Sequence, residues 1–305
     1  MQTDSPLARV AGPQPSLPPQ GAPPWPAQTR VHCTWRWTAA SPLALQAPNQ
    51  NVASLDGRSP ELDAQAGDFG DYNLALHVGD DPRRVIARRQ QLLNELQGAQ
   101  STIWLNQVHG VRCVEITAAT PTVVAEHTDQ FTADAAWTRE NGVALAVMTA
   151  DCLPVLFTDR AGSLAAVAHA GWRGLCAGVI PALVQQLPAA AAELYAFIGP
   201  AISAPRYEVG AEVAHAFQAA GLADPDTVRP RGSGKFHVDL VRAVRSQLRD
   251  LGVGSVTGGH WCTAAQACFY SHRRYRQRVD KDHSENRSEN APEHTGRQAC
   301  LVWLP

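Results

Sequence analysis

The sequence predicts an α/β protein with one folded domain built around a mixed sheet. Short apolar runs of strand length alternate irregularly with longer stretches of helical periodicity, which is typical of α/β folds. Hydrophobic residues make up 45% of the 305 residues and charged residues 18%, the profile of an ordinary globular protein with a sizeable core.

Composition also excludes several classes of protein. The net charge of −2 gives no basic surface for nucleic acid or for a membrane, and no apolar run reaches the length of a membrane-spanning helix. The seven cysteines are scattered and odd in number, without the spacing of a disulfide framework. We therefore expect reduced thiols and a cytoplasmic protein without nucleic-acid or membrane partners, and the oligomeric state stays open.

The N-terminal part is dominated by proline and small polar residues. Residues 1–29 hold eight of the 22 prolines and show little apolar periodicity, so we expect a disordered tail. The folded domain is expected to cover residues 30–305, with a first strand at 31–37. Residues 38–67 then form a long insertion without clear periodicity.

The middle of the chain predicts one helix and a series of short strands. The helix begins at Pro82, which suits a first helical turn, and ends near Leu96, with Asp80 or Asp81 as its N-cap. Strands are predicted at 103–105, 111–116, 143–148, 153–157 and 164–167.

The C-terminal half continues the alternation of helices and strands. Helices are predicted at about 175–187, where Pro181 should introduce a kink or mark a break, at 210–220, and at 240–251 before Gly252. Further strands are predicted at 194–198, 253–256 and 298–304. The polar, charged stretch 277–294 is expected to be a second insertion and a mobile loop.

A hairpin connects two of the predicted strands and brings two reactive side chains together. With Arg160 and Ala161 at the centre of the turn, Cys152 lies directly opposite His169. Facing side chains of such a pair have Cβ atoms about 4.5–5.5 Å apart, a spacing at which a thiolate and an imidazole can share one metal ion.

His109 also ends an apolar run, so the candidate cluster is His109, Cys152 and His169. Three nitrogen and sulfur ligands leave one position of a tetrahedral zinc site open, as in catalytic zinc sites, and copper accepts the same ligands. Alternatively, Cys152 is a nucleophile with a histidine as its base, or a small buried apolar residue without chemistry. Asp151 either orients a histidine and takes a proton, or caps the turn.

Arg173 follows His169 closely and lies near a predicted helix start. An arginine at a helix N-terminus can hold an anion through paired N–H donors, and the alternative is an ordinary surface arginine.

Seven short segments carry a resemblance to a known family. They are residues 73–82 (NLALHVGDDP), 106–110 (NQVHG), 149–155 (TADCLPV), 169–174 (HAGWRG), 198–202 (IGPAI), 269–274 (FYSHRR) and 295–297 (TGR). In this order they resemble the YfiH family, also labelled laccase-domain proteins or multicopper polyphenol oxidases, over about residues 31–305.

The resemblance implies a three-layer α/β/α domain and a catalytic zinc held by His109, Cys152 and His169. It implies a purine nucleoside phosphorylase, in which inorganic phosphate attacks C1′ of adenosine, inosine or methylthioadenosine to give the base and ribose 1-phosphate. Adenosine deaminase activity is also ascribed to the family. Two alternatives are an amide hydrolase that edits peptidoglycan precursors at the same site and a copper-dependent oxidase of phenols.

The resemblance also places substrate-binding residues. Asn73, His77 and Gln107 match family positions that line the cleft and are expected to contact the nucleoside. Phosphorolysis needs an anion pocket, for which Arg173 is the main candidate. Arg36 is a weaker candidate, because the insertion that follows it interrupts the family pattern.

Overall fold

The computed structural model describes most of the expected domain. The described residues are 25–26, 28–34, 69–70, 72–120, 131–282 and 294–305. The expected tail up to residue 24, the insertion at 38–67, and Arg36 lie outside these residues, as does most of the second insertion.

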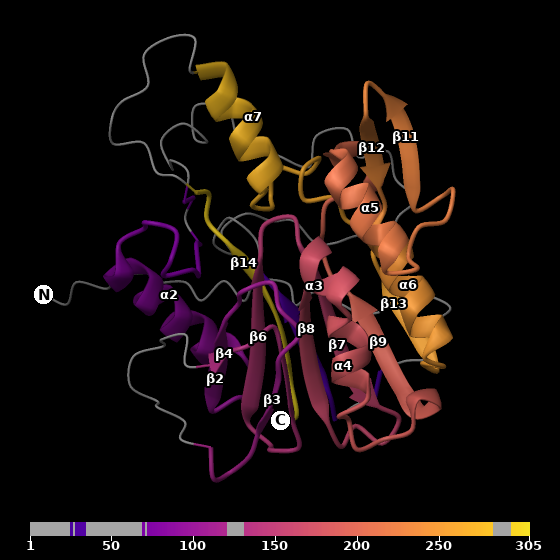
Figure 1. Cartoon of the computed structure of the whole chain (residues 1–305). Helices are drawn as coiled ribbons and strands as arrows, with labels where there is room; N and C mark the ends of the chain where they lie inside the picture. The colour runs from indigo at the N-terminus through magenta and orange to yellow at the C-terminus, as the bar shows by residue number, and fades with distance from the viewer. Residues whose placement is uncertain (1–24, 27, 35–68, 71, 121–130, 283–293) are drawn as a thin grey trace, which may run out of the picture.

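Two large sheets dominate the structure, and both mix parallel with antiparallel pairs (Figure 1). The first has the order β1 (Arg30–Cys33), β14 (Gln298–Trp303), β6 (Val143–Thr149), β2 (Ser101–Asn106), β4 (Phe131–Thr132). The second has the order β13 (Ser255–Gly258), β9 (Leu194–Ile198), β7 (Leu153–Asp159), β8 (Ala165–Ala170), β5 (Ala135–Thr138), β3 (Cys113–Ile116). A small sheet, which the sequence did not predict, has the order β10 (Glu208–Val209), β12 (Lys235–Val238), β11 (Val228–Gly232).

The α/β class is confirmed, but the expected arrangement in three layers is not. The two large sheets share one apolar core, to which the first sheet contributes Ile103, Leu145 and Val302 and the second Leu156 and Val167, all buried. Two sheets therefore pack against each other where the sequence suggested one. The apolar runs identify strands, but they do not say which strands share a sheet.

Helices cover the outer face of each sheet. The described helices are α2 (Pro82–Glu95), α3 (Trp172–Ala177), α4 (Val179–Val184), α5 (Ala211–Ala219), α6 (Leu240–Asp250) and α7 (His272–Asp282). Leu92 of α2 packs with the first sheet, whereas α3 to α6 contribute to the core on the second. None of the described helices has the length and apolar character needed to cross a bilayer.

The ends of the helices follow from particular side chains. Asp81 caps α2 by accepting a hydrogen bond from the backbone N–H of Arg83 at 2.9 Å, as expected. The predicted helix at 175–187 is broken at Gly178, whose φ of 92° is left-handed, and not at Pro181. Pro181 lies in the first turn of α4, where its missing N–H costs no helical hydrogen bond.

The stretch expected to be a loop from residue 277 is helical as far as Asp282. Ser271 begins α7, because its Oγ accepts a hydrogen bond from the backbone N–H of Arg274 at 3.1 Å. Tyr275 and Val279 bury one face of this helix, which explains why its charged residues do not prevent it from forming. Residues 283–293 lie outside the described part.

The β7–β8 hairpin has a longer turn than expected. His169 faces Pro154, so the predicted direct pairing of Cys152 with His169 is wrong by two residues. The cause is Asp159, whose carboxylate accepts hydrogen bonds from the backbone N–H and the hydroxyl of Ser163. Asp159 and Ser163 therefore both belong to the turn. Because strand side chains alternate with a period of two, a shift of two keeps Cys152 on the same side as His169.

Candidate metal centre

Three side chains from separate segments meet at the ends of the central strands. His109 follows β2, Cys152 precedes β7, and His169 lies in β8. Their possible ligand atoms all lie within 4.8 Å of one another, with 3.6 Å between Cys152 Sγ and His109 Nε2. The two imidazole rings stand nearly perpendicular, with centroids 4.7 Å apart. The structure thus brings together the three residues that the sequence proposed as ligands.

One edge of this cluster matches the edge of a tetrahedral metal site. With zinc bonds of about 2.3 Å to sulfur and about 2.05 Å to nitrogen, a tetrahedral angle separates the two ligand atoms by about 3.6 Å. The distance between Cys152 Sγ and His109 Nε2 is 3.6 Å. The donor set of two imidazoles and one thiolate suits zinc or copper, so the residues fit the implied metal.

Asp134, which the sequence analysis missed, connects two of these residues. Its Oδ1 accepts hydrogen bonds from His169 Nδ1 at 2.8 Å and from the backbone N–H of His109 at 2.9 Å. Its Oδ2 accepts from the backbone N–H groups of Val108 at 3.2 Å and Gly110 at 2.6 Å. The side chain is fully buried. An acidic residue at the start of an apolar strand was the only signal in the sequence.

Electrostatics within the cluster favour a thiolate beside an imidazolium in the metal-free protein. Burial opposes the charge on Cys152, but His169 and the hydrogen bond from His109 outweigh it and lower the pKa of the thiol to about 6. Burial likewise opposes the charge on His169, but the thiolate and Asp134 raise the pKa of its imidazole to about 9. Cys152 therefore carries the charge that a metal ligand needs at neutral pH.

Asp151 points away from the cluster. Its carboxylate accepts hydrogen bonds from Thr263 Oγ1 at 2.6 Å, Ser271 Oγ at 3.0 Å and the backbone N–H of Arg273 at 2.7 Å. Its φ of 89° is unusual for a residue other than glycine. The structure thus shows Asp151 holding the start of α7 next to Cys152.

Gln107 is also engaged with the backbone. Its Nε2 donates to the carbonyl of Met148 at 2.8 Å, and its Oε1 accepts from the N–H of Met148 at 2.7 Å. The side chain therefore extends the β2–β6 ladder beyond its last backbone pair and fixes the segment that leads to His109.

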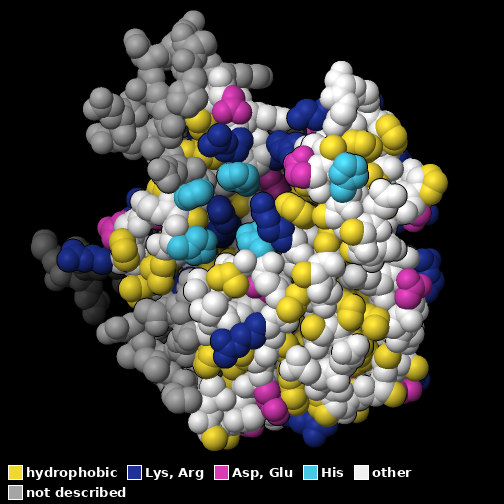
Figure 2. All heavy atoms as spheres, in the orientation of Figure 1, with side chains coloured by type: hydrophobic (Ala, Val, Ile, Leu, Met, Phe, Trp, Pro, Cys, Tyr) yellow, Lys and Arg dark blue, Asp and Glu magenta, His cyan; other side chains and the backbone are white. Residues whose placement is uncertain are grey.

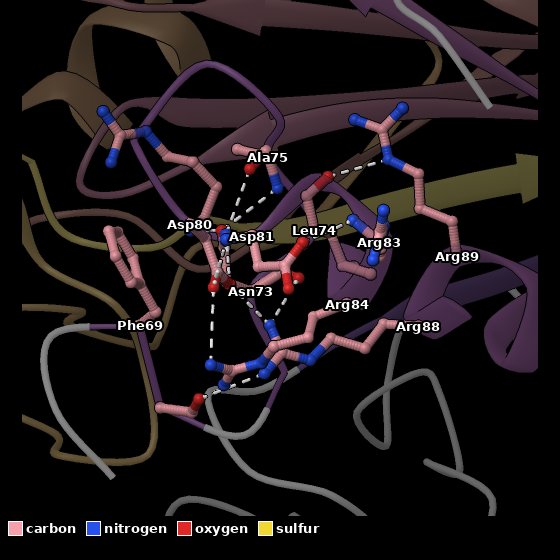
Figure 3. Close-up of polar contacts among 12 residues, drawn as sticks. Phe69, Asn73, Leu74, Ala75, Asp80, Asp81, Arg83, Arg84, Arg88 and Arg89 are labelled. Carbon is pink, nitrogen blue, oxygen red and sulfur yellow. Dashed lines mark hydrogen bonds and ion pairs between the residues drawn. The ribbon is translucent and has the colours of Figure 1, made fainter. Parts of the chain in front are cut away.

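Asn73 anchors the loop that precedes α2 (Figure 3). Its amide nitrogen donates to the carbonyl of Ala75 and to Asp80, and its amide oxygen accepts from the N–H groups of Ala75 and Arg297. Arg88 completes the network through a 2.7 Å ion pair with Asp80. Asn73 is fully buried, so it supports the position of Arg297 rather than lying at the surface.

The remaining expected contact residues lie at the surface. His77 and Arg173 are both exposed. Arg173 lies in the first turn of α3, with its guanidinium 4.4 Å from the ring centre of Trp172.

Three further residues, Arg273, Tyr207 and Arg297, lie near Asp151 and the thiolate. Arg273 stacks on the ring of Tyr207 at 5.5 Å. Burial lowers the pKa of Arg297, and the negative charges of Cys152 and Asp151 oppose this shift. Histidine and arginine side chains gather on this face of the molecule, around the lower end of α7 (Figures 1 and 2). Besides the two histidines, Arg297 is thus a cationic group close enough to interact with the thiolate.

Known proteins share both this sequence pattern and this fold. Residues 61–305 match the family described as multi-copper polyphenol oxidoreductase laccase. Purine nucleoside phosphorylase PA4543 of Pseudomonas aeruginosa is 42% identical over 238 residues, which are 77% of this chain and 87% of the relative. Purine nucleoside phosphorylase YfiH of Escherichia coli is 36% identical over 237 residues, with the same shares.

Solved structures of similar proteins share the fold of this chain. The Neisseria meningitidis protein NMB0706 has a TM-score of 0.69 and 34% identity, covering 93% of this chain and 98% of that chain. YlmD from Geobacillus stearothermophilus has a TM-score of 0.68 and 25% identity, and the match covers 91% of this chain and 92% of YlmD. The chain therefore belongs to the family of multi-copper polyphenol oxidoreductase laccases, and its relatives include proteins named purine nucleoside phosphorylases.

Proposed function

We propose that this chain is a zinc-dependent purine nucleoside phosphorylase with adenosine deaminase activity. Its substrates would be adenosine, inosine and methylthioadenosine, with inorganic phosphate as the second reactant. The observation that carries the proposal is a His-Cys-His cluster of metal-binding geometry beside several arginines, in a chain whose relatives are named purine nucleoside phosphorylases.

His109, Cys152 and His169 would hold the zinc ion. Bound there, zinc would supply a Lewis acid that polarises a substrate oxygen or lowers the pKa of a water molecule. Cys152 is the anionic ligand, and its lowered pKa keeps it deprotonated at neutral pH. Copper would fit the same donors, so metal analysis is part of the test.

Arg173, Arg273 and Arg297 are the groups that we assign to phosphate. In phosphorolysis a phosphate oxygen forms a bond to C1′ while the bond from C1′ to the purine nitrogen breaks, and the base leaves with the electron pair and takes up a proton. Guanidinium groups bind phosphate oxygens through paired N–H donors and neutralise their charge. Arg273 is held in place by Tyr207, on which it stacks, and Asp151 binds its backbone N–H.

The test combines metal analysis with a phosphate-dependence assay on the purified chain. We expect about one zinc per chain and release of hypoxanthine from inosine that requires added phosphate and forms ribose 1-phosphate. Adenosine should also yield inosine and ammonia, independently of phosphate. A zinc-loaded protein that turns over no nucleoside would refute the proposal and would favour amide hydrolysis at the same site.

A matched pair of variants on α7 tests the anion pocket. Arg273→Ala should raise the KM for phosphate by about tenfold or more, since it removes a charge-assisted contact. Arg276→Ala removes an exposed arginine that pairs with Asp280 on the same helix, and it should leave that KM unchanged. Equal effects of the two substitutions would contradict the assignment of Arg273.

A further inference from the structure

One buried carboxylate ties together two of the candidate metal ligands. Asp134 receives one hydrogen bond from the side chain of His169 and three from consecutive backbone N–H groups of the segment that carries His109. The backbone N–H of His169 also donates to the carbonyl of Asp134 at 2.7 Å.

The bond to His169 selects the nitrogen that can bind a metal. A neutral imidazole carries its proton on one nitrogen and a lone pair on the other. A carboxylate that accepts from Nδ1 keeps the proton there and leaves the lone pair on Nε2, which faces the cluster. Partners of this kind orient metal-binding histidines and raise their basicity.

The three backbone bonds hold His109 in a strained conformation. His109 has a φ of 60°, which residues other than glycine rarely adopt and which costs about 1–3 kcal/mol. The Asp134 carboxylate offsets this cost, because it accepts hydrogen bonds from the backbone N–H of His109 and from those of its two neighbours, Val108 and Gly110. Without it, the segment would relax and the ring of His109 would turn away from Cys152.

We infer that Asp134 is the positioning residue of the metal centre, fixing the tautomer of His169 and the orientation of His109. The inference rests on the proposed metal site, but not on which substrate that site turns over. It predicts that the affinity for zinc depends on Asp134 although the carboxylate does not touch the metal.

Asp134→Asn is the sharpest substitution, since it conserves shape but replaces one acceptor oxygen with a donor. If the amide oxygen still accepts the hydrogen bonds from the backbone N–H groups of Val108 and Gly110, the new NH2 group faces Nδ1 of His169. Nδ1 then accepts a hydrogen bond, and the proton moves to Nε2, where it blocks the metal. We expect zinc affinity to fall by about 10- to 100-fold.

Asp159→Asn is the matched control. Asp159 is also buried and also accepts from a backbone N–H and a side chain, but at the opposite end of the β7–β8 hairpin. Its substitution should lower the thermal stability of the metal-free protein and leave zinc affinity at the wild-type value. Competition with a chromophoric chelator measures the affinity, and thermal unfolding of each metal-free variant reports on the fold.

A second readout is the tautomer itself. Nitrogen-15 histidine spectra of the zinc-loaded wild type, assigned with His169→Ala, should show His169 protonated at Nδ1. The inference alone is overturned if the wild type binds zinc and Asp134→Asn binds it equally well, or if Nδ1 of His169 carries no proton. A wild type that binds no zinc would overturn the proposed metal site together with the inference, whereas zinc binding without nucleoside turnover would overturn only the proposed reaction.

Discussion

Gly171 offers a steric test of the metal centre that leaves the ligands themselves unchanged. It precedes α3 with φ −65° and ψ 159°, an extended conformation that alanine adopts without strain. A Cβ at this position would lie 2.6 Å from Cδ2 of His109 and 3.1 Å from Sγ of Cys152. Gly171→Ala therefore puts a methyl group against two of the three ligands.

The expected effect follows from these distances. Ordinary van der Waals contact begins at 3.4 Å and the Cβ would lie at 2.6 Å, so the ring of His109 must move by about 0.8 Å. Metal–nitrogen distances vary by only about 0.2 Å around their preferred values. A displacement four times larger removes His109 as a ligand, and we expect zinc affinity to fall by at least about 100-fold. The cost to stability should stay near 1 kcal/mol, from the poorer N-cap.

Chelator competition on Gly171→Ala, with Gly110→Ala as the control, measures this effect. A Cβ at Gly110 would meet its nearest atom, Oδ2 of Asp134, at 3.4 Å, which is ordinary contact. The control lies next to His109 in the chain, so it reports on any general effect of adding a methyl group to this segment. Wild-type zinc affinity in Gly171→Ala, or equal losses in both variants, would refute the reasoning.

Three further predictions concern charge and packing. In the metal-free protein, the rate of alkylation of Cys152 should rise with pH around a midpoint near 6, because only the thiolate reacts, and bound zinc should block the reaction. Burial raises the pKa of Cys113 to about 12, so mass spectrometry should find this residue unmodified at pH 7. Asp151→Asn should lower the free energy of unfolding by about 1–3 kcal/mol in denaturant titrations, since it leaves a buried donor unpaired. Phe157→Ala, in the fully buried core, should cost about 3–5 kcal/mol by the same measurement without changing zinc affinity per folded protein.

The sequence predicted that the three candidate ligands come together, because each lies at or near the end of an apolar run. An apolar strand pattern indicates where the chain enters and leaves the core. His109, Cys152 and His169 all lie at or near the ends of such strands. The pairing of Cys152 with His169 was wrong by two residues, since the sequence does not reveal that the Asp159 carboxylate bonds to Ser163 and lengthens the turn. The error left both side chains on one side of the sheet, because two residues make a full strand period.

The supporting residues could not be predicted in the same way. Gln107, Asn73 and Asp151 were assigned to substrate or catalysis from the resemblance or their positions, yet their polar atoms bind backbone and hydroxyl groups from distant segments. Asp134 was missed, although it makes four hydrogen bonds to the site. Such contacts depend on which segments the fold brings together, and the spacing of residues along the chain carries little information about them.

The family description and the names of the relatives suggest different chemistries, and the ligands distinguish between them. Oxidation of phenols by a multicopper enzyme needs several copper ions and more histidine ligands than one cluster supplies. Among the residues that the structure describes, only His109, Cys152 and His169 form a group of three or more side chains placed to share an ion. His272 and His294 face each other with ring centroids 6.4 Å apart, but no third ligand joins them in the described chain. A single metal ion held by these three residues would stabilise developing negative charge, which suits the proposed phosphorolysis and deamination better than electron transfer.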